Sequence, residues 1–231
     1  MHKVKIVLTF FLSLLFLSGC ASYYAVTVND YLDITETPDP IPAGASFCVL
    51  ANKNENNPIL DNEIKAKIEK LLVESGYKIA SYEKADFYLS FSYSVSSGRR
   101  ATELRPVFQA GQTETVQTYK SSGKTSTSII NLPGYTTYVP YRITVFTSSL
   151  TLNVLDAASL RANNQKKIIW IGENSSASQN SEIRDTINYL LVASFENFGR
   201  NTGRSIKTEI STNDTRVKQI TWQEGGAVKR K

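Results

Sequence analysis

Two stretches of the chain carry apolar residues at the spacing of an amphipathic helix. The first runs from Ile59 to Ser75, and the second runs from Ser181 to Phe198. In each, apolar side chains recur at intervals of three and four, which places them on one face of a helix with 3.6 residues per turn. Gly76 and Gly199 follow the two patterns at the position of a C-terminal cap, and Ser181 is suited to cap the second helix at its start.

Other stretches alternate apolar and polar residues, which is the period of a half-buried strand. The clearest is Phe87–Val95, and further strands are predicted at Ser46–Ala51, Tyr141–Leu155, Lys167–Gly172 and, at an edge, Ile206–Ile210. One-faced strands combined with two amphipathic helices predict an α/β (α+β) fold. The expected architecture is a two-layer sandwich, in which both helices cover one face of a largely antiparallel sheet.

The segment 96–140 is rich in Ser, Thr, Gly and Tyr and separates the two longest predicted strands. A structureless loop of this length is improbable in a compact domain. We therefore expect a β-hairpin-like insertion with arms at Val107–Tyr119 and Ser126–Val139. The predicted domain spans 46–211, preceded by a proline-rich tether at 20–45 and followed by a flexible polar tail at 212–231.

The first nineteen residues have the layout of an export signal, with Lys3 and Lys5 ahead of the apolar run Ile6–Leu17. That run is shorter than the ~20 apolar residues of a spanning helix, although an uncleaved membrane anchor stays open as an alternative. It ends in Leu17-Ser18-Gly19-Cys20, which resembles the lipobox of bacterial lipoproteins. The resemblance implies cleavage between Gly19 and Cys20, a diacylglyceryl thioether on Cys20, and a further acyl chain such as palmitate on the new amino terminus. Ala21 stands where an aspartate would favour the inner membrane, so the outer membrane is expected.

The composition excludes several classes of active site. The single histidine, His2, lies in the signal segment, so the mature chain has no imidazole for a Ser-His-Asp or Cys-His hydrolase or for the common zinc sites. Cys48 lies in an apolar run and is expected to be a buried, inert thiol. We expect no metal and no cofactor. The formal net charge of +5 loses Lys3 and Lys5 with the signal, and the remainder is too small to indicate nucleic-acid binding.

The insertion contains most of the candidate binding residues. Arg99 and Arg100, near Glu103 and Arg105, could grip an anionic ligand, with a solvated loop as the alternative. The tyrosines Tyr119, Tyr135 and Tyr138 could form a contact surface, with cross-strand pairing as the alternative.

Two further patterns carry weaker chemistry. Ser122-Gly123-Lys124-Thr125 resembles the end of a P-loop, but Thr118 stands where that motif needs glycine, so nucleotide binding is not expected. The acids Asp86, Asp156 and Glu173 are scattered. Carboxylate chemistry would need two of them within ~5–9.5 Å of each other across a cleft.

Several local motifs together resemble one family of envelope lipoproteins. They are Pro42-Ala43-Gly44-Ala45-Ser46-Phe47, Asn57-Pro58-Ile59-Leu60 through Gly76-Tyr77, Glu83-Lys84-Ala85-Asp86-Phe87-Tyr88-Leu89-Ser90-Phe91, and Asn201-Thr202-Gly203. The chain is similar to the domain of unknown function forty-one thirty-six over about residues 42–210. The resemblance implies an envelope lipoprotein and supplies no catalytic residues to transfer, and the insertion at 96–140 departs from the shorter family form.

The function expected from these patterns is that of a non-enzymatic lipoprotein, anchored in the outer membrane, that serves as a binding or structural module. Its mature domain is expected in the periplasm or at the cell surface. Its expected partners are the membrane, through the lipid, and an envelope protein or glycan, with no nucleic acid. The alternative is a carboxylate-dependent hydrolase of cell-wall or polysaccharide substrates.

Overall fold

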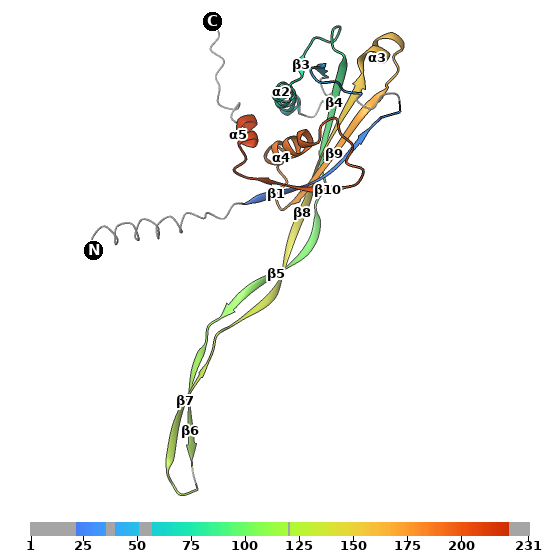
Figure 1. Ribbon diagram of the computed structural model, residues 1–231. Coiled ribbons are helices and arrows are strands. Elements are labelled where there is room, and N and C mark those ends of the chain that lie inside the picture. The colour runs from blue at the N-terminus through green and yellow to red at the C-terminus, as the bar shows by residue number, and fades with distance from the viewer. Residues whose placement is uncertain (1–21, 36–39, 51–56, 120, 222–231) are drawn as a thin grey trace, which may run out of the picture. The chain divides into compact units, whose positions relative to one another are not determined.

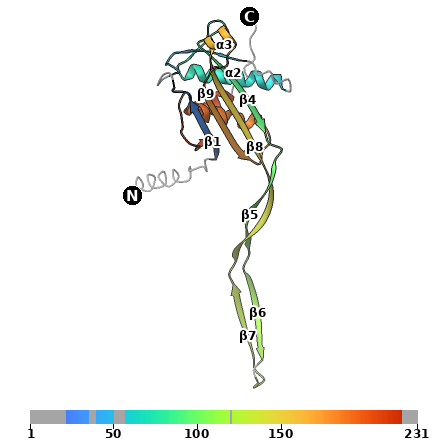
Figure 2. The same cartoon turned by 90° about the vertical axis from the view of Figure 1, so that its right-hand side faces the viewer.

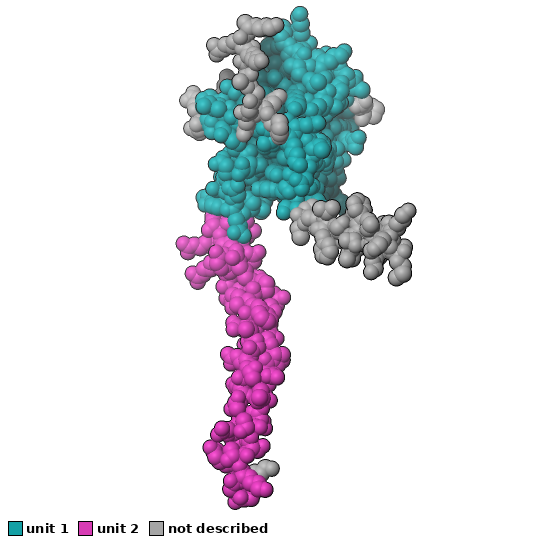
Figure 3. All heavy atoms as spheres, turned by 90° about the vertical axis from the view of Figure 1, so that its left-hand side faces the viewer, with its two compact units in different colours: residues 1–97, 146–231 teal, residues 98–145 magenta. Residues whose placement is uncertain are grey.

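The computed structural model describes residues 22–35, 40–50, 57–119 and 121–221, and the predicted signal segment, Gly19 and Cys20 lie outside these ranges. The chain divides into two compact units (Figure 3). The first unit comprises residues 1–97 and 146–231, and the second comprises residues 98–145. Each unit has its own pattern of strand pairing.

The first unit contains a mixed, mainly antiparallel sheet. Only the pairings of β2 with β3 and with β4 are parallel, whereas its other ladders are antiparallel. The strands lie in the order β10 (Ile206–Ser211), β1 (Tyr23–Leu32), β9 (Ile168–Ser178), β8 (Tyr135–Asp156), β4 (Phe87–Val95), β2 (Ser46–Val49) and β3 (Lys78–Ile79). This arrangement confirms the predicted sheet, and β4 has the predicted bounds.

Helices α2 (Pro58–Glu74) and α4 (Ile183–Glu196) lie together on one face of this sheet, as predicted (Figures 1 and 2). Asn57 caps α2 by accepting a hydrogen bond from the Leu60 amide, and Gly76 follows the helix with a φ of +88°, which favours glycine. The cap of α4 is Glu182 rather than the predicted Ser181. The main core lies between the helices and the sheet, and its largest fully buried members include Phe47, Ile64, Ile68, Leu72, Leu89, Leu152, Trp170, Ile187, Leu190 and Leu191.

The prediction of a tether over 20–45 is wrong for its first half. Residues Tyr23–Leu32 form β1, which pairs with β9 on one side and β10 on the other. Val26 and Val28 are fully buried in the main core. The strand was hidden in the sequence because the next inward position is Asp30, a residue type that seldom lies in a core.

The prediction of a flexible tail over 212–231 is wrong for its first part, which forms a helix. Helix α5 (Thr215–Thr221) buries Val217 and Ile220 in the main core, three residues apart on one helix face. Residues 222–231 of that tail lie outside the described ranges. Helix α3 (Ala157–Asn163), which the sequence patterns did not predict, packs Ala157 and Leu160 with Tyr88 and Leu155 in a second, smaller cluster.

The second unit consists of two successive antiparallel ladders, which confirms the predicted hairpin. In the first ladder, β5 (Arg99–Gln109) pairs with residues 135–145 of β8. In the second ladder, β6 (Gln112–Tyr119) pairs with β7 (Thr125–Leu132). We call this unit the hairpin ribbon. Across the described part of the chain, no helix combines the length and the apolar character needed to cross a membrane.

Candidate functional site

The hairpin ribbon exposes large apolar side chains along its whole length. The exposed fractions are 64% for Leu104, 69% for Phe108, 77% for Tyr119, 69% for Ile129 and 64% for Tyr138. No side chain of the ribbon is fully buried among its described residues. An isolated two-stranded ribbon gains little from burial, and contiguous exposed apolar patches mark interaction surfaces. The ribbon is therefore the candidate functional site.

Two glycines join the ladders of the ribbon. A Cβ added to Gly111 would lie 2.5 Å from the Leu132 carbonyl oxygen, and one added to Gly134 would lie 2.7 Å from the ring of Phe108. Real Cβ atoms do not approach other atoms so closely, because the repulsion would force the backbone apart. The close crossing of the two strands at this junction therefore depends on glycine at both positions.

One face of the first ladder combines an apolar patch with two arginines. Register places Leu104 opposite Pro140, Pro106 opposite Tyr138, and Phe108 opposite Thr136. Because side chains alternate along a strand, these residues share a face with Arg100 and Arg142, which are diagonal neighbours on the two strands. Within the described residues, no carboxylate lies at ion-pair distance from either arginine. We call this surface face A, and it consists of Arg100, Leu104, Pro106, Phe108, Tyr138, Pro140 and Arg142.

The opposite face of the same ladder, face B, is also apolar, and of its two arginines, Arg99 and Arg105, the latter is paired within the ribbon. Val107, Val139 and Tyr141 are exposed on it. The Arg105 guanidinium lies 3.6 Å from the centre of the Tyr141 ring and 3.9 Å from a Glu103 carboxylate oxygen. Arg105 is thus occupied within the ribbon, whereas Arg100 and Arg142 on face A are open to a ligand.

The structure exposes all five predicted contact residues of the insertion but divides them between faces. Arg100 and Tyr138 lie on face A, whereas Arg99 and Tyr135 lie on face B. Tyr119 lies in the other ladder, at the end of β6 and opposite Thr125. A single ligand of small size would therefore contact only some of these residues.

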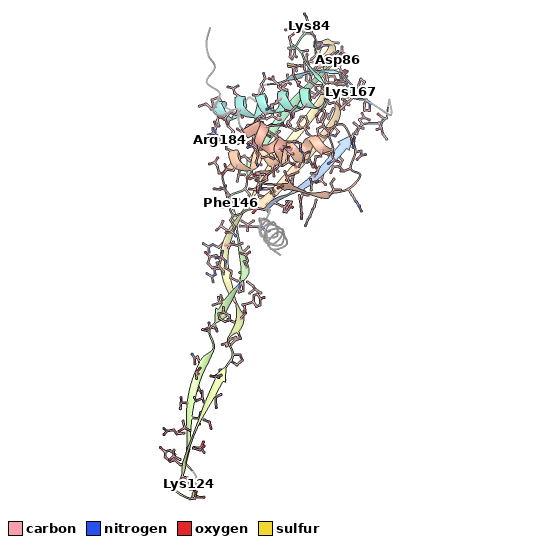
Figure 4. The ribbon with its side chains drawn as sticks, turned by 60° about the vertical axis from the view of Figure 1, so that its left-hand side comes forward. Lys84, Asp86, Lys124, Phe146, Lys167 and Arg184 are labelled. Carbon is pink, nitrogen blue, oxygen red and sulfur yellow. The ribbon has the colours of Figure 1, made fainter. Side chains whose placement is uncertain are left out.

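The resemblance to a P-loop has no structural counterpart. Gly123 and Lys124 lie in the turn that joins β6 to β7 (Figure 4). A P-loop needs a strand followed by a helix whose N-terminus faces the phosphates. A hairpin turn provides neither the helix nor its dipole.

The scattered acids named in the sequence have local structural roles. Asp86 accepts hydrogen bonds from the Ser46 amide and hydroxyl at 2.9 and 2.7 Å, and these bonds lower the pKa of its carboxyl group (Figure 4). Asp156 caps α3 through the Ser159 amide. Glu173 lies on β9, where register places it opposite Thr151 and Asn29. These positions give Asp86 and Asp156 structural partners, and the lowered pKa of Asp86 is opposite to the shift that a general acid needs.

Cys48 is half-buried rather than fully buried, and it packs against the smaller cluster around Tyr88. Burial raises the pKa of its thiol; Lys65 lowers this pKa to a smaller extent, whereas Glu69 and Glu83 raise it further. A raised pKa lowers the thiolate fraction at neutral pH, which agrees with the predicted inert role.

A pocket of about 440 Å³ lies between α2, α4 and α5, and it was not predicted from the sequence. Its wall includes Leu71, Glu74, Phe195 and Arg216. Arg216 Nη2 lies 2.7 Å from both a Glu196 and an Asp214 oxygen. The two carboxylate oxygens are therefore at most about 5.4 Å apart, which is close enough for the carboxylate pair of a glycosidase to be considered.

The electrostatics of this pair oppose acid catalysis. The hydrogen bond from Arg216 lowers the pKa of the Asp214 carboxyl, and the same bond raises the pKa of the guanidinium. A general acid needs the reverse shift, so that it holds a proton at neutral pH. Arg216 instead acts as an ionic clamp that holds α5 against the end of α4.

The one carboxyl with a strongly raised pKa among the described residues is Asp30. Desolvation raises its pKa from 3.8 to about 7. Only 1% of the residue is exposed, and neither carboxylate oxygen has a hydrogen-bond partner among the described residues. Asp30 points to the helix-covered face opposite Gly172, where an added Cβ would lie 3.0 Å from its oxygen. It is too enclosed to meet a substrate, and it acts on stability instead.

Groups of three or more His, Cys, Asp or Glu side chains that could hold a metal ion are not found in the described ranges. The model of the family described as Domain of unknown function (DUF4136) matches residues 33–198. The chain belongs to this family. The match contains the whole hairpin ribbon, together with α2, α3, β9 and α4. Among curated proteins, no sequence matches the chain.

The solved structures that resemble this chain do so only distantly. A PDZ domain protein from Parabacteroides distasonis ATCC 8503 is 15% identical, with a TM-score of 0.44 over 83% of this chain and 39% of that one. This member of DUF4136 therefore spans well under half of that protein. The PelC dodecamer from Paraburkholderia phytofirmans is 12% identical, with a TM-score of 0.37 over 73% of this chain and 94% of that one.

Proposed function

We propose that this DUF4136 protein is a lipoprotein of the outer membrane that binds an envelope component through its hairpin ribbon and catalyses no reaction. Two observations support the anchor, namely the apolar segment Ile6–Leu17 and the Leu17-Ser18-Gly19-Cys20 sequence that follows it. The lipid on Cys20 would hold the protein at the membrane, with the folded residues in the periplasm or at the cell surface.

The observation that carries the binding role is the ribbon itself. Its apolar side chains are exposed on both faces, although a soluble chain gains nothing from keeping Phe108, Tyr119 and Ile129 in water. The expected partner is an envelope protein or a glycan. Tyrosines set among threonines and serines suit either, because they offer large, rigid contact area beside adaptable hydrogen-bonding groups.

The hydrolase alternative finds less support. Glu196 and Asp214 are both paired with Arg216, which lowers the pKa of Asp214, and the carboxyl with the raised pKa, Asp30, is enclosed in the core. Neither arrangement offers an acid and a base to one substrate. If the Arg216 pocket nevertheless hydrolysed polysaccharide, Glu196→Gln would abolish release of reducing ends from isolated cell envelope.

The binding role is tested by removing the ribbon without opening the sheet. Ser96 and Thr147 lie opposite each other, with the Ser96 amide 2.9 Å from the Thr147 carbonyl oxygen. An Asn-Gly turn joining Ser97 to Phe146 would therefore close β4 and β8 as a tight hairpin. The matched control replaces only the tip, residues 121–124, by a turn of equal length.

We expect the shortened protein to retain its thermal unfolding transition and its membrane anchoring. Its crosslinked envelope partner, identified by mass spectrometry after in-membrane crosslinking, should disappear. The tip control should remain folded and keep the contacts made by the first ladder. An unchanged set of crosslinked partners in the shortened protein would refute the proposed role of the ribbon.

A further inference from the structure

Face A carries two open cationic groups beside a continuous apolar patch. Arg100 and Arg142 are exposed diagonal neighbours, and Leu104, Pro106 and Tyr138 continue the same face away from them. The ribbon as a whole carries six basic residues against two acidic ones, Glu103 and Glu114. An anionic, partly apolar partner would complement such a surface.

In the first ladder, exposed apolar side chains lie on both faces of the same stretch of the two strands. Leu104 and Phe108 belong to face A, whereas Val107, Val139 and Tyr141 belong to face B. A flat protein surface could cover only one of these faces. An interfacial lipid layer would surround the ladder and remove both faces from water.

The edges of the ladder argue against pairing with another strand. Pro106 and Pro140 have no N–H, and a proline is tolerated in a two-stranded ladder where its nitrogen faces outward. Each proline therefore deletes a donor from a free edge. Edge prolines of this kind oppose the addition of a strand from a second copy, and they leave binding to the side chains.

We infer that the first ladder of the ribbon lies in the headgroup layer of an anionic phospholipid bilayer, an inference that rests on the membrane anchoring proposed above. Arg100 and Arg142 bind lipid phosphates, and Leu104, Phe108 and Tyr138 enter the boundary with the acyl chains. The depth is interfacial, because the unpaired backbone groups of the free edges need water or headgroups as partners. The second ladder then remains for the protein or glycan partner.

Arginine beside aromatic and aliphatic residues is the composition that favours this layer. Aromatic side chains concentrate at membrane interfaces, and basic residues are attracted to anionic headgroups. Each arginine near such a surface contributes a factor of about five in binding, so removing both should lower the equilibrium constant for insertion of the ladder into the headgroup layer about 25-fold, while the lipid anchor still holds the protein.

The test uses the full-length, lipidated protein purified from a diderm host and reconstituted into vesicles. An environment-sensitive NBD dye is attached to Tyr138→Cys on face A in a Cys48→Ser background. The matched control carries the dye at Thr127→Cys in the second ladder. Vesicles contain phosphatidylethanolamine with either phosphatidylglycerol or phosphatidylcholine, and a nitroxide-labelled lipid serves as quencher.

We expect the dye at position 138, but not at position 127, to be blue-shifted and quenched by the labelled lipid in phosphatidylglycerol vesicles. The Arg100→Gln/Arg142→Gln variant should lose most of this quenching, as should wild type in phosphatidylcholine vesicles or at high salt. A dye at position 138 that remains in water would overturn the inference.

If the dye at position 138 is blue-shifted but not quenched, and the shift grows with protein density, the result would overturn the inference. It would show that face A contacts a second copy of the chain and not lipid. A dye that remains in water and a dye that contacts a second copy both leave the proposed anchoring intact. Absence of acyl chains in the purified protein would instead refute the anchoring itself, and intact mass measured on the same sample distinguishes the two failures.

Discussion

At the scale of single residues, the most consequential feature is a carboxyl group that is buried in the core and has no hydrogen-bond partner in the part of the chain that the structure describes. Asp30 sits on β1 beneath the helix layer, and burial raises its pKa to about 7. The unfolded chain would ionise this group near its ordinary pKa of 3.8. Folding therefore becomes less favourable as pH rises from about 4 to about 7, because in this range the folded protein holds a proton on Asp30 that the unfolded chain has released. Above about pH 7 the carboxyl is ionised in both states, and the loss of stability stays constant.

Asp30→Asn should remove this pH dependence. At pH 8 the variant should be more stable than wild type by about 2–4 kcal/mol, since each pKa unit corresponds to ~1.4 kcal/mol, and at pH 4 the two should be equal. Urea denaturation at the two pH values measures the difference. The control is Asp33→Asn, because hydrogen bonds from Thr35 lower the pKa of exposed Asp33 and predict an effect of opposite sign. Equal stabilities of Asp30→Asn and wild type at pH 8 would contradict this account.

The sequence predicts some site residues but not how they are combined, and it gave no sign that Asp30 would be buried. The five contact residues of the ribbon could be assigned to an exposed insertion because their neighbours in the sequence are mostly Ser, Thr and Gly. Their division between two faces could not, because it depends on the register of β5 against β8. The Arg216 clamp likewise joins residues from two elements, and no spacing in the sequence links Glu196 to Asp214.

At the scale of elements, strong periodicity decided which predictions succeeded. Strand β4 and helices α2 and α4 bury apolar residues at the spacing of their element, so their patterns are recognisable in the sequence. Helix α3 buries only Ala157, and α5 buries two residues, so neither left a recognisable pattern. Strand β1 was obscured by its buried acid and by the prolines that follow it.

The placement of β1 as an internal strand predicts an asymmetric response to substitution. Val28 is fully buried toward α4, whereas its neighbour Asn29 lies on the other face of the sheet. Val28→Asp should cost at least about 3 kcal/mol of unfolding free energy, because it places an unpaired carboxylate in the core. Asn29→Thr should change stability by less than about 1 kcal/mol. Chemical denaturation measures both, and equal tolerance at the two sites would restore the tether prediction.

The junction between the ribbon's ladders predicts a local defect. Gly134→Ala would drive a methyl group to within 2.7 Å of the Phe108 ring and 2.8 Å of the Gln109 carbonyl oxygen. Amide hydrogen exchange should therefore become faster in β5 and in residues 135–145. The amides of α2 and α4 should be unaffected, because they belong to the other unit.

Thr136→Ala is the control, since it removes an exposed side chain opposite Phe108 and leaves the glycine crossing unchanged. Unaltered exchange in Gly134→Ala would show that the strands do not cross closely at this junction.

At the scale of the whole molecule, the two units have different proposed roles. The sheet and its helices supply a stable core, and the ribbon supplies exposed binding area without a core of its own. Membership of DUF4136 agrees with the predicted family and assigns no activity. The proposed division of roles requires that the protein be held at a membrane, where its exposed apolar ribbon can bind lipid or an envelope partner.

The measurement that tests this claim most directly is intact mass combined with membrane fractionation of wild type and Cys20→Ala in a diderm host. Wild type should float with the outer membrane at the mass of residues 20–231 plus acyl chains, and Cys20→Ala should carry no acyl chains and leave that fraction. Wild type that is soluble and unlipidated, with the same fractionation as Cys20→Ala, would contradict the account.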